Sequence, residues 1–263
     1  MGQDDNGRSL ERALANTQED AEKALAATGK LQRAVKTAVK AAETGDLTAL
    51  RRAFDDADDA VGLVAELTAG LRDGWEFVDE AMEEAHLGSG PYKDELLDAA
   101  RIAGVGLFDQ GEDVLACYPS LVRIAPARRQ VVIDKKPVRQ IRPSFLMRAL
   151  SKAQAKEPQL RAGQFIELLH QAYRLRGGDG GSQRLGQIHA VLTLLPSAKR
   201  DYSRQEFARD IYLLDGSGLT QTKSGARMRL HTGSTGARSR PGDLLVVVTR
   251  EGVEKTYYAV EFD

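Results

Sequence analysis

The stretch Pro196–His231, PSAKRDYSRQEFARDIYLLDGSGLTQTKSGARMRLH, decides the fold that we predict for this chain. Ser203 and Glu206 have the S-x-x-E spacing of a capping box, in which each side chain satisfies a backbone amide at the start of a helix. Apolar residues then recur at helical spacing, and glycines follow them: Phe207, Ile211 and Leu214, then Gly216 and Gly218. We therefore expect an amphipathic helix over 203–216 that stops at these glycines.

Short alternating segments on both sides of a turn follow this helix. The pattern predicts a strand over 219–222, a turn over Lys223–Ala226 and a second strand over Arg227–His231, which together would form a wing. Upstream, an apolar helical face ends at Pro196: Leu185, Ile188, Leu192 and Leu195. Two helices and a wing are the parts of a winged helix-turn-helix, so the predicted fold class is mainly α with small β elements (α+β).

In such a unit the helix over 203–216 would enter a DNA groove. We predict groove contact by Arg204, Gln205 and Arg209, with Lys223 and Arg227 contacting DNA from the wing. The same helix also carries acidic residues that would repel phosphate: Glu206, Asp210 and Asp215. Because a fold alone does not assign a function, contact with a protein instead of DNA stays open as the alternative.

Charge is distributed unevenly along the 263 residues. Residues 1–118 carry 12 Lys and Arg against 25 Asp and Glu, a net charge of -13, whereas residues 119–263 carry 25 against 13, a net charge of +12. A basic half suggests an anionic partner. The alternative is that the two halves neutralise each other by packing together.

Two long helices with coiled-coil periodicity are predicted in the acidic half. The expected seam of the first is Leu10, Leu14, Thr17, Ala21, Ala24, Thr28, Leu31, Val35, Ala38 and Ala42. The expected seam of the second is Leu50, Phe54, Ala57, Val61, Val64, Thr68, Leu71, Trp75, Val78, Met82 and Ala85. Because Gly45 and Asp46 leave only a short link, the helices should pair as an antiparallel hairpin. A third helix with an apolar side over 96–107 would follow.

A basic segment begins after Tyr118–Pro119. Short β-prone runs are expected at 121–124, 130–133 and 138–142, with a turn over Asp134–Pro137. The segment and its surroundings supply the cations that we predict to contact phosphate: Arg128, Arg129, Lys135, Lys136, Arg139 and Arg142. Helices over 144–155 and 163–176 and a closing hairpin of 244–249 with 256–262 complete the chain.

These patterns predict four parts. Residues 1–8 would be a disordered tail, 9–118 an acidic, elongated helical or coiled-coil domain, 119–143 a basic β-rich connector, and 144–263 a winged-helix-like α+β domain with a C-terminal β-hairpin.

Sequence signals for catalysis are weak. Arg184 and His189 match the R-x4-H spacing of the HEPN ribonuclease family, but the family prefers a polar residue after the arginine and this chain has Leu185. The four histidines show no metal-ligand spacing, and the single Cys117 is expected to be a small buried hydrophobe. No catalytic residue, cofactor or metal is therefore predicted.

The patterns together predict a non-enzymatic, nucleic-acid-associated adaptor subunit of a multi-protein bacterial assembly, such as one for genome maintenance, transcription control or phage defence. DNA would be held by the basic half, and a protein partner or a second copy by the N-terminal helices. One alternative is a protein-interaction or scaffold module that binds no nucleic acid, and another is a HEPN-like ribonuclease. Without an apolar leader, a membrane-spanning run or a disulfide framework, we expect a cytoplasmic protein that does not contact membranes.

Overall fold

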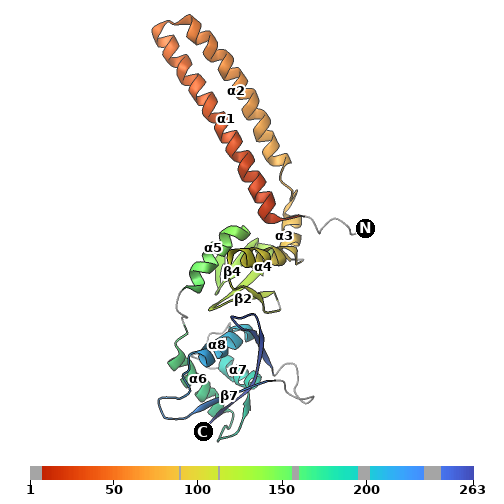
Figure 1. Ribbon diagram of the computed structural model, residues 1–263, viewed down its shortest axis with the longest axis vertical. Coiled ribbons are helices and arrows are strands. Elements are labelled where there is room, and N and C mark those ends of the chain that lie inside the picture. The colour runs from red at the N-terminus through yellow and green to blue at the C-terminus, as the bar shows by residue number, and fades with distance from the viewer. Residues whose placement is uncertain (1–7, 89, 112, 156–159, 195–201, 234–243) are drawn as a thin grey trace, which may run out of the picture. The chain divides into compact units, whose positions relative to one another are not determined.

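A computed structural model describes residues 8–88, 90–111, 113–155, 160–194, 202–233 and 244–263 (Figure 1). Residues 1–7 of the predicted tail lie outside this described part of the chain. The chain divides into two compact units. The first unit comprises Met1–Glu95, Pro126–Arg129 and Arg142–Ser144, and the second unit comprises Leu96–Ala125, Gln130–Ile141 and Phe145–Asp263. Helices and strands are both present, as the predicted α+β class requires.

The first unit begins with an antiparallel helical hairpin, which confirms the prediction from the heptad pattern. Helix α1 (Leu10–Thr44) starts at Ser9, whose side chain accepts from the Arg12 amide, and ends at Gly45 in the left-handed conformation. Helix α2 (Leu47–Asp73) starts at Asp46, whose carboxylate accepts from the amides of residues 48 and 49. A glycine is needed at the first of these two linking positions because φ is 73° there.

The predicted seam is wrong at every second position of both helices. The buried residues of α1 are Leu10, Ala13, Ala24, Ala27, Ala34 and Ala41, and those of α2 are Ala53 and Ala60. The residue after each of these positions is more exposed, including Val35 at 48% and Phe54 at 54%. Alanine occupies the close contacts because its single methyl group lets two helix backbones approach, whereas valine or phenylalanine there would push the axes apart.

The second helix is also shorter than predicted, because α2 ends at Asp73 and a new helix, α3 (Glu80–Gly88), follows. Helix α4 (Pro91–Ala103) supplies Glu95, whose carboxylate accepts from the backbone amides of Leu10 (2.9 Å) and Glu11 (3.2 Å). The buried His86 ring lies 3.0 Å from the same carboxylate. A carboxylate at a helix N-terminus is favourable, so Glu95 holds the start of α1 in place.

The second unit contains a meander of five antiparallel strands. These strands are β1 (Phe108–Asp109), β2 (Val114–Cys117), β3 (Ser120–Ala125), β4 (Gln130–Ile133) and β5 (Lys136–Val138). The runs predicted at 121–124 and 130–133 are therefore confirmed, and a short 3-10 helix, η1 (Pro126–Arg128), lies between them. The run predicted at 138–142 is wrong, because the turn takes only Asp134 and Lys135.

That short turn explains the shift of β5. Asp134 and Lys135 both have positive φ, 45° and 70°, which is the geometry of a two-residue hairpin turn that matches strand twist. A two-residue turn pairs Ile133 with Lys136, so the strand begins two residues earlier than predicted. Helix α5 (Pro143–Gln154) follows and agrees closely with the helix predicted over 144–155.

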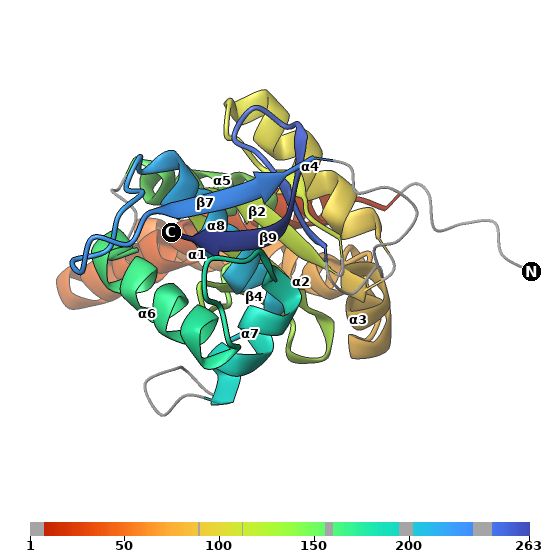
Figure 2. The same ribbon diagram turned by 90° about the horizontal axis from the view of Figure 1, so that it is seen from below.

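The rest of the second unit packs three helices on a second sheet. The helices are α6 (Ala162–Leu175), α7 (Leu185–Leu194) and α8 (Arg204–Gly216). Figure 2 shows α6 and α7 next to each other beside the strands β7 and β9. Their apolar sides share one core with the sheet, including Leu169, Ile188 and Phe207.

Strand β9 (Glu254–Phe262) is the centre of this second sheet. In the described part of the chain it has three antiparallel partners. Strand β7 (Met228–Thr232) pairs with residues 257–262 of β9, β6 (Gln183–Arg184) pairs with residues 259 and 260, and β8 (Leu245–Val248) pairs with residues 254–257. The predicted closing hairpin is confirmed by β8 and β9. The predicted wing over 219–231 is wrong: Gln221 and Arg227 form only an isolated bridge, and β7 pairs with β9 instead. An alternating pattern identifies a strand but not its partner.

None of the helices in the described ranges combines the length and the apolar character needed to cross a membrane.

Candidate nucleic-acid interface

Helix α8 was the predicted groove-reading element, and its local structure is the predicted one. The Ser203 side chain accepts from the Glu206 amide, and the Glu206 carboxylate accepts from the Ser203 amide at 2.8 Å, so the capping box is complete. Phe207, Ile211 and Leu214 point into the core of the second unit. The remaining side of α8 would have to be open to solvent for the helix to enter a groove.

That remaining side is covered by the five-stranded sheet of the same unit. Tyr118 at the end of β2 contacts Tyr212 with ring centroids 4.7 Å apart. Tyr212 and Leu213 both pack against the small cluster formed by Val114, Ala116, Tyr118 and Leu121. Every residue of the α8 segment Arg204–Asp215 is buried or half-buried. Helix α8 is thus a core element with strands on one side and helices on the other.

The polar residues of α8 also bond within the unit. Arg123 of β3 donates to the Ser203 hydroxyl at 2.9 Å and to the Gln205 side chain at 3.4 Å. Arg204 donates to the backbone carbonyl of Leu244. The predicted groove contacts at Arg204 and Gln205 are therefore placed in intramolecular bonds. The sequence pattern missed this because it showed α8 but not the sheet that covers it.

Arg209 lies at the centre of a charged cluster between α8 and the β4–β5 turn. Its guanidinium contacts Asp134 at 2.9 Å and Asp210 at 2.8 Å, and the Tyr202 hydroxyl donates to Asp210 at 2.7 Å. Burial alone lowers the pKa of Arg209, but the two carboxylates outweigh it and the pKa is raised. Burial raises the pKa of Asp210, which Arg209 partly offsets. Nearby, Lys135 pairs with Glu206 at 3.3 Å.

Two arginines of the predicted connector (119–143), Arg129 and Arg142, belong to the first unit and form ion pairs with acidic residues of that unit. Arg129 contacts Glu80 at 2.8 Å and Glu83 at 3.5 Å. Arg142 donates to Glu11 at 2.7 Å and to Gln18 at 2.6 Å. These two arginines therefore pair with acidic residues of the chain's own helices, as the alternative to an anionic partner predicts.

The other predicted phosphate contacts are exposed. Arg128 follows β3 in η1, Lys136 lies in the edge strand β5, and Arg139 follows that strand. Lys223 and Arg227 are exposed in the segment between α8 and β7, where the Lys223 amide donates to Glu167 of α6 at 2.6 Å. The eleven predicted residues are divided between the two units: Arg128, Arg129 and Arg142 belong to the first, and the other eight belong to the second.

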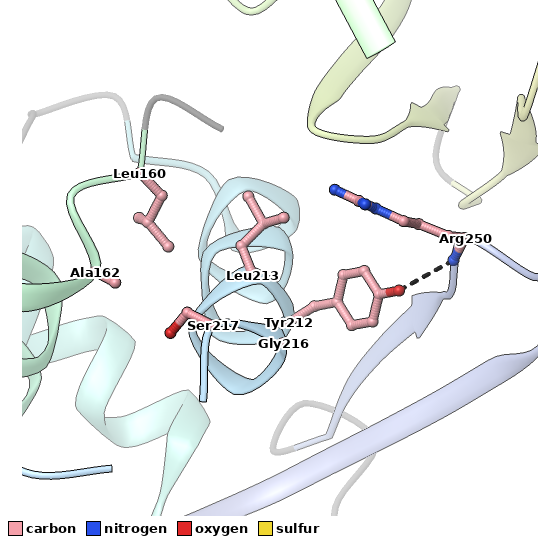
Figure 3. A pocket seen from close by; sticks show the side chains of 7 residues that line it. All are labelled: Leu160, Ala162, Tyr212, Leu213, Gly216, Ser217 and Arg250. Atoms are coloured by element: carbon pink, nitrogen blue, oxygen red, sulfur yellow. Dashed lines mark hydrogen bonds between the residues drawn. The ribbon is translucent and has the colours of Figure 1, made fainter. Parts of the chain in front are cut away.

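A pocket of about 480 Å³ lies at the C-terminal end of α8 (Figure 3). Leu160 and Ala162 line one side, and Tyr212, Leu213 and Ser217 line another. The Tyr212 hydroxyl accepts from the Arg250 amide at 3.1 Å. The Arg250 side chain also lines the pocket and adds a positive charge to it. Sequence reasoning missed this pocket because its residues come from three separate segments.

The structure shows the surroundings of the three residues considered for catalysis, Arg184, His189 and Cys117. The ribonuclease hypothesis requires Arg184 and His189 to lie on one helix. In the structure Arg184 lies in β6 and His189 lies in α7. The His189 Nε2 is 2.9 Å from the Tyr202 carbonyl, so it is the proton-bearing nitrogen, and the ring stacks on Phe207 at 5.1 Å. Burial raises the pKa of the Cys117 thiol to about 12, so the reactive thiolate is disfavoured at neutral pH.

Within the described residues, no group of three or more His, Cys, Asp or Glu side chains is arranged to hold a metal ion. Comparison with known proteins gave no match to a family model, to a curated protein or to a solved structure.

Proposed function

We propose that this protein is a non-enzymatic, nucleic-acid-associated adaptor, and that exposed basic side chains of the second unit contact the polyanion in place of α8. One observation carries this proposal: the two units differ in the sign of their net charge, as the two halves of the sequence do, although the difference is about half as large. The second unit has 23 Lys and Arg against 17 Asp and Glu, a net charge of +6, and the first unit has 14 against 21, a net charge of -7. Lys136 and Arg139 are exposed on this positive unit.

We also infer that residues 162–263 form a winged helix with an altered role for its third helix. The inference is supported by the element order α6, β6, α7, α8, β7, β8, β9, with β9 paired to β6 and β7 as well as to β8. In a winged helix a short strand before the second helix completes such a sheet, and the wing connects the last two main strands. Lys223 and Arg227 come before β7, so they would not belong to a wing that follows that strand.

A second candidate is a protein-interaction module without nucleic-acid binding. It is favoured by the cover on α8, because Tyr118 and Arg123 occupy the side of the helix that a groove would need. The two candidates differ in what the exposed cations do. In the nucleic-acid adaptor they replace counterions on a phosphate backbone. In the protein-interaction module they are hydrated surface charges that bind no polyanion.

Salt-dependent binding to a fluorescent 30-base-pair duplex of mixed sequence tests the proposal. Wild-type protein is expected to bind at low salt and to lose affinity steeply as salt rises. Lys136→Glu with Arg139→Glu should lower the affinity at least tenfold and reduce the slope of log K against log salt by about 2. Lys30→Glu with Arg33→Glu is the matched control, because it makes the same change of charge on exposed residues of α1.

An absence of wild-type binding at 50 mM salt would reject the proposal and leave the protein-interaction module. An equal loss in the α1 control would show that overall charge, and not the β5 edge, governs binding.

A further inference from the structure

The hairpin exposes large apolar side chains on only one side. The exposed large hydrophobic residues of its two helices are Leu25, Val35, Val39, Leu47, Phe54 and Val61, with exposed fractions of 48% to 72%. We call these six side chains the apolar face. A soluble monomer rarely exposes a contiguous apolar patch of several hundred square ångströms without a binding role.

The seam explains why these residues share one side. Val35, Phe54 and Val61 each follow a buried alanine by one residue, and Leu47 lies seven residues before Phe54. Leu25 and Val39 follow Ala24 and Ala38 of the same seam and join the stripe of Val35 at helical spacing. In an antiparallel pair, a local two-fold axis normal to the plane of the helices exchanges them. Positions one step beyond the seam therefore lie on the same side on both helices.

The opposite side of the hairpin has a different character. Residues one step before the seam on α1 include Lys23, Lys30 and Thr37, and their counterparts on α2 include Asp56. By contrast, the apolar stripe of α1 has no charged residue between Ala21 and Ala42. The charged side is suited to water, whereas the apolar face requires cover.

We propose that a second copy of this chain covers the apolar face, forming a four-helix bundle by two-fold symmetry. The charges on the face argue for a copy of itself. The stripe of α2 has two charged side chains between Leu47 and Val61, Arg51 and Asp58, which are one heptad apart and of opposite sign. A two-fold axis across Phe54 places Arg51 of each copy opposite Asp58 of the other and pairs both charges.

The same axis matches the apolar residues in size and position. On α2 it places Leu47 opposite Val61 and the two copies of Phe54 near each other. The link between the helices is only Gly45 and Asp46, so residues equally distant from it lie at the same level. Thr37 is thus level with Phe54, and Val35 and Val39 lie two residues to either side of that level, so the axis places each opposite the other on α1. One symmetry element therefore satisfies five of the six apolar residues and both charges.

The size of the contact sets the expected strength. The overlap spans roughly 17 residues of each helix, or about 26 Å, across a hairpin about 20 Å wide. This corresponds to about 500 Å² per copy and about 1,000 Å² in total, which is at the small end of specific interfaces. We therefore expect a dimer with a Kd in the micromolar range, independent of whether the chain binds nucleic acid.

A charge-swap experiment on the full chain tests the interface by sedimentation equilibrium between about 1 and 200 μM. Wild-type protein should be dimeric at the upper concentrations, and Phe54→Asp should be monomeric throughout. Arg51→Glu alone and Asp58→Arg alone should also be monomeric, because each creates two like-charge contacts across the axis. A 1:1 mixture of these two variants should form a dimer, since every contact then has opposite signs.

The double variant Arg51→Glu with Asp58→Arg should restore self-association for the same reason. Arg52→Glu is the matched control, because it reverses the neighbouring charge outside the apolar face and should leave the dimer intact. Helicity by circular dichroism shows that each variant is folded. Wild-type protein that is monomeric at 200 μM would overturn the proposal, and so would single variants that are monomeric without forming a dimer on mixing.

Discussion

Arg209 of α8 lies 2.9 Å from Asp134 in the β4–β5 turn, so the helix predicted to read DNA is joined to the sheet that covers it. The neighbouring Asp210 is 8% exposed and depends on Arg209 and Tyr202 for its bonds. This cluster links the two sheets of the second unit through one helix. Its role in stability can be measured.

Replacing Arg209 with alanine should destabilise the protein by about 3 kcal/mol, because it leaves the Asp210 carboxylate buried without its cation. Urea unfolding followed by far-UV circular dichroism measures the change. Arg229→Ala is the control, since its side chain is 63% exposed and its ion pairs with Glu261 and Asp263 should contribute less than about 0.5 kcal/mol. Equal effects of the two substitutions would contradict this account of α8.

The carboxylate of Glu95 should make the first unit sensitive to acid. Burial raises the pKa of Glu95, but His86 and the amides of Leu10 and Glu11 outweigh it, so the pKa lies below the ordinary value of 4.5. A lowered pKa means that the stabilisation is present above pH 4.5 and is lost as the pH falls through the folded-state pKa. Glu95→Gln should therefore cost about 2 kcal/mol at pH 7 and less with increasing acidity.

The fluorescence of Trp75, the only tryptophan of the chain, reports on this unit, because the indole contacts Phe77 with ring centroids 5.4 Å apart. Glu43→Gln on the exposed end of α1 serves as the control. A stability difference for Glu95→Gln that stays constant from pH 7 to pH 3 would be inconsistent with the role of this carboxylate.

The alanine seam predicts that enlarging a buried methyl group separates the helices. Ala53 is 1% exposed, so Ala53→Leu should overpack the seam and destabilise the hairpin by about 1–3 kcal/mol. Thermal unfolding followed at 222 nm measures the loss. Ala69→Leu, at an exposed position of α2, should change stability by less than about 0.5 kcal/mol. If leucine were tolerated at residue 53, the observed seam would be wrong.

Gly178 has a packing role that its glycine-rich surroundings obscure. A Cβ atom at this position would lie 2.4 Å from the ring of Tyr173, which is 1% exposed and cannot move aside freely. Gly178→Ala should therefore destabilise the second unit by about 2 kcal/mol. Gly181→Ala is matched to it, because a Cβ there meets nothing within 4 Å. Urea unfolding compares the two, and the reverse order of stability would refute the prediction.

Sequence alone was sufficient for features that depend on neighbours along the chain. The capping box of Ser203 and Glu206, the hairpin link at Gly45 and Asp46, and the strand at 130–133 were all predicted at the positions where they occur. These features are local, because caps, turns and short alternating runs are specified within a few residues. The eleven site residues could be identified as basic or polar, but not as exposed or covered.

Only the tertiary structure decided which faces of these elements are used. The heptad pattern of α1 fits two adjacent stripes, and packing selected the one with alanine at the contact, leaving Val35 outside. The alternating residues 228–232 could pair with a strand on either side, and β9 took the place expected of 219–222. Arg209 was predicted to contact a groove, and in the structure its side chain pairs with Asp134 of the β4–β5 turn. Periodicity fixes the direction of a side chain within its own element, but its surroundings depend on segments far away in the chain.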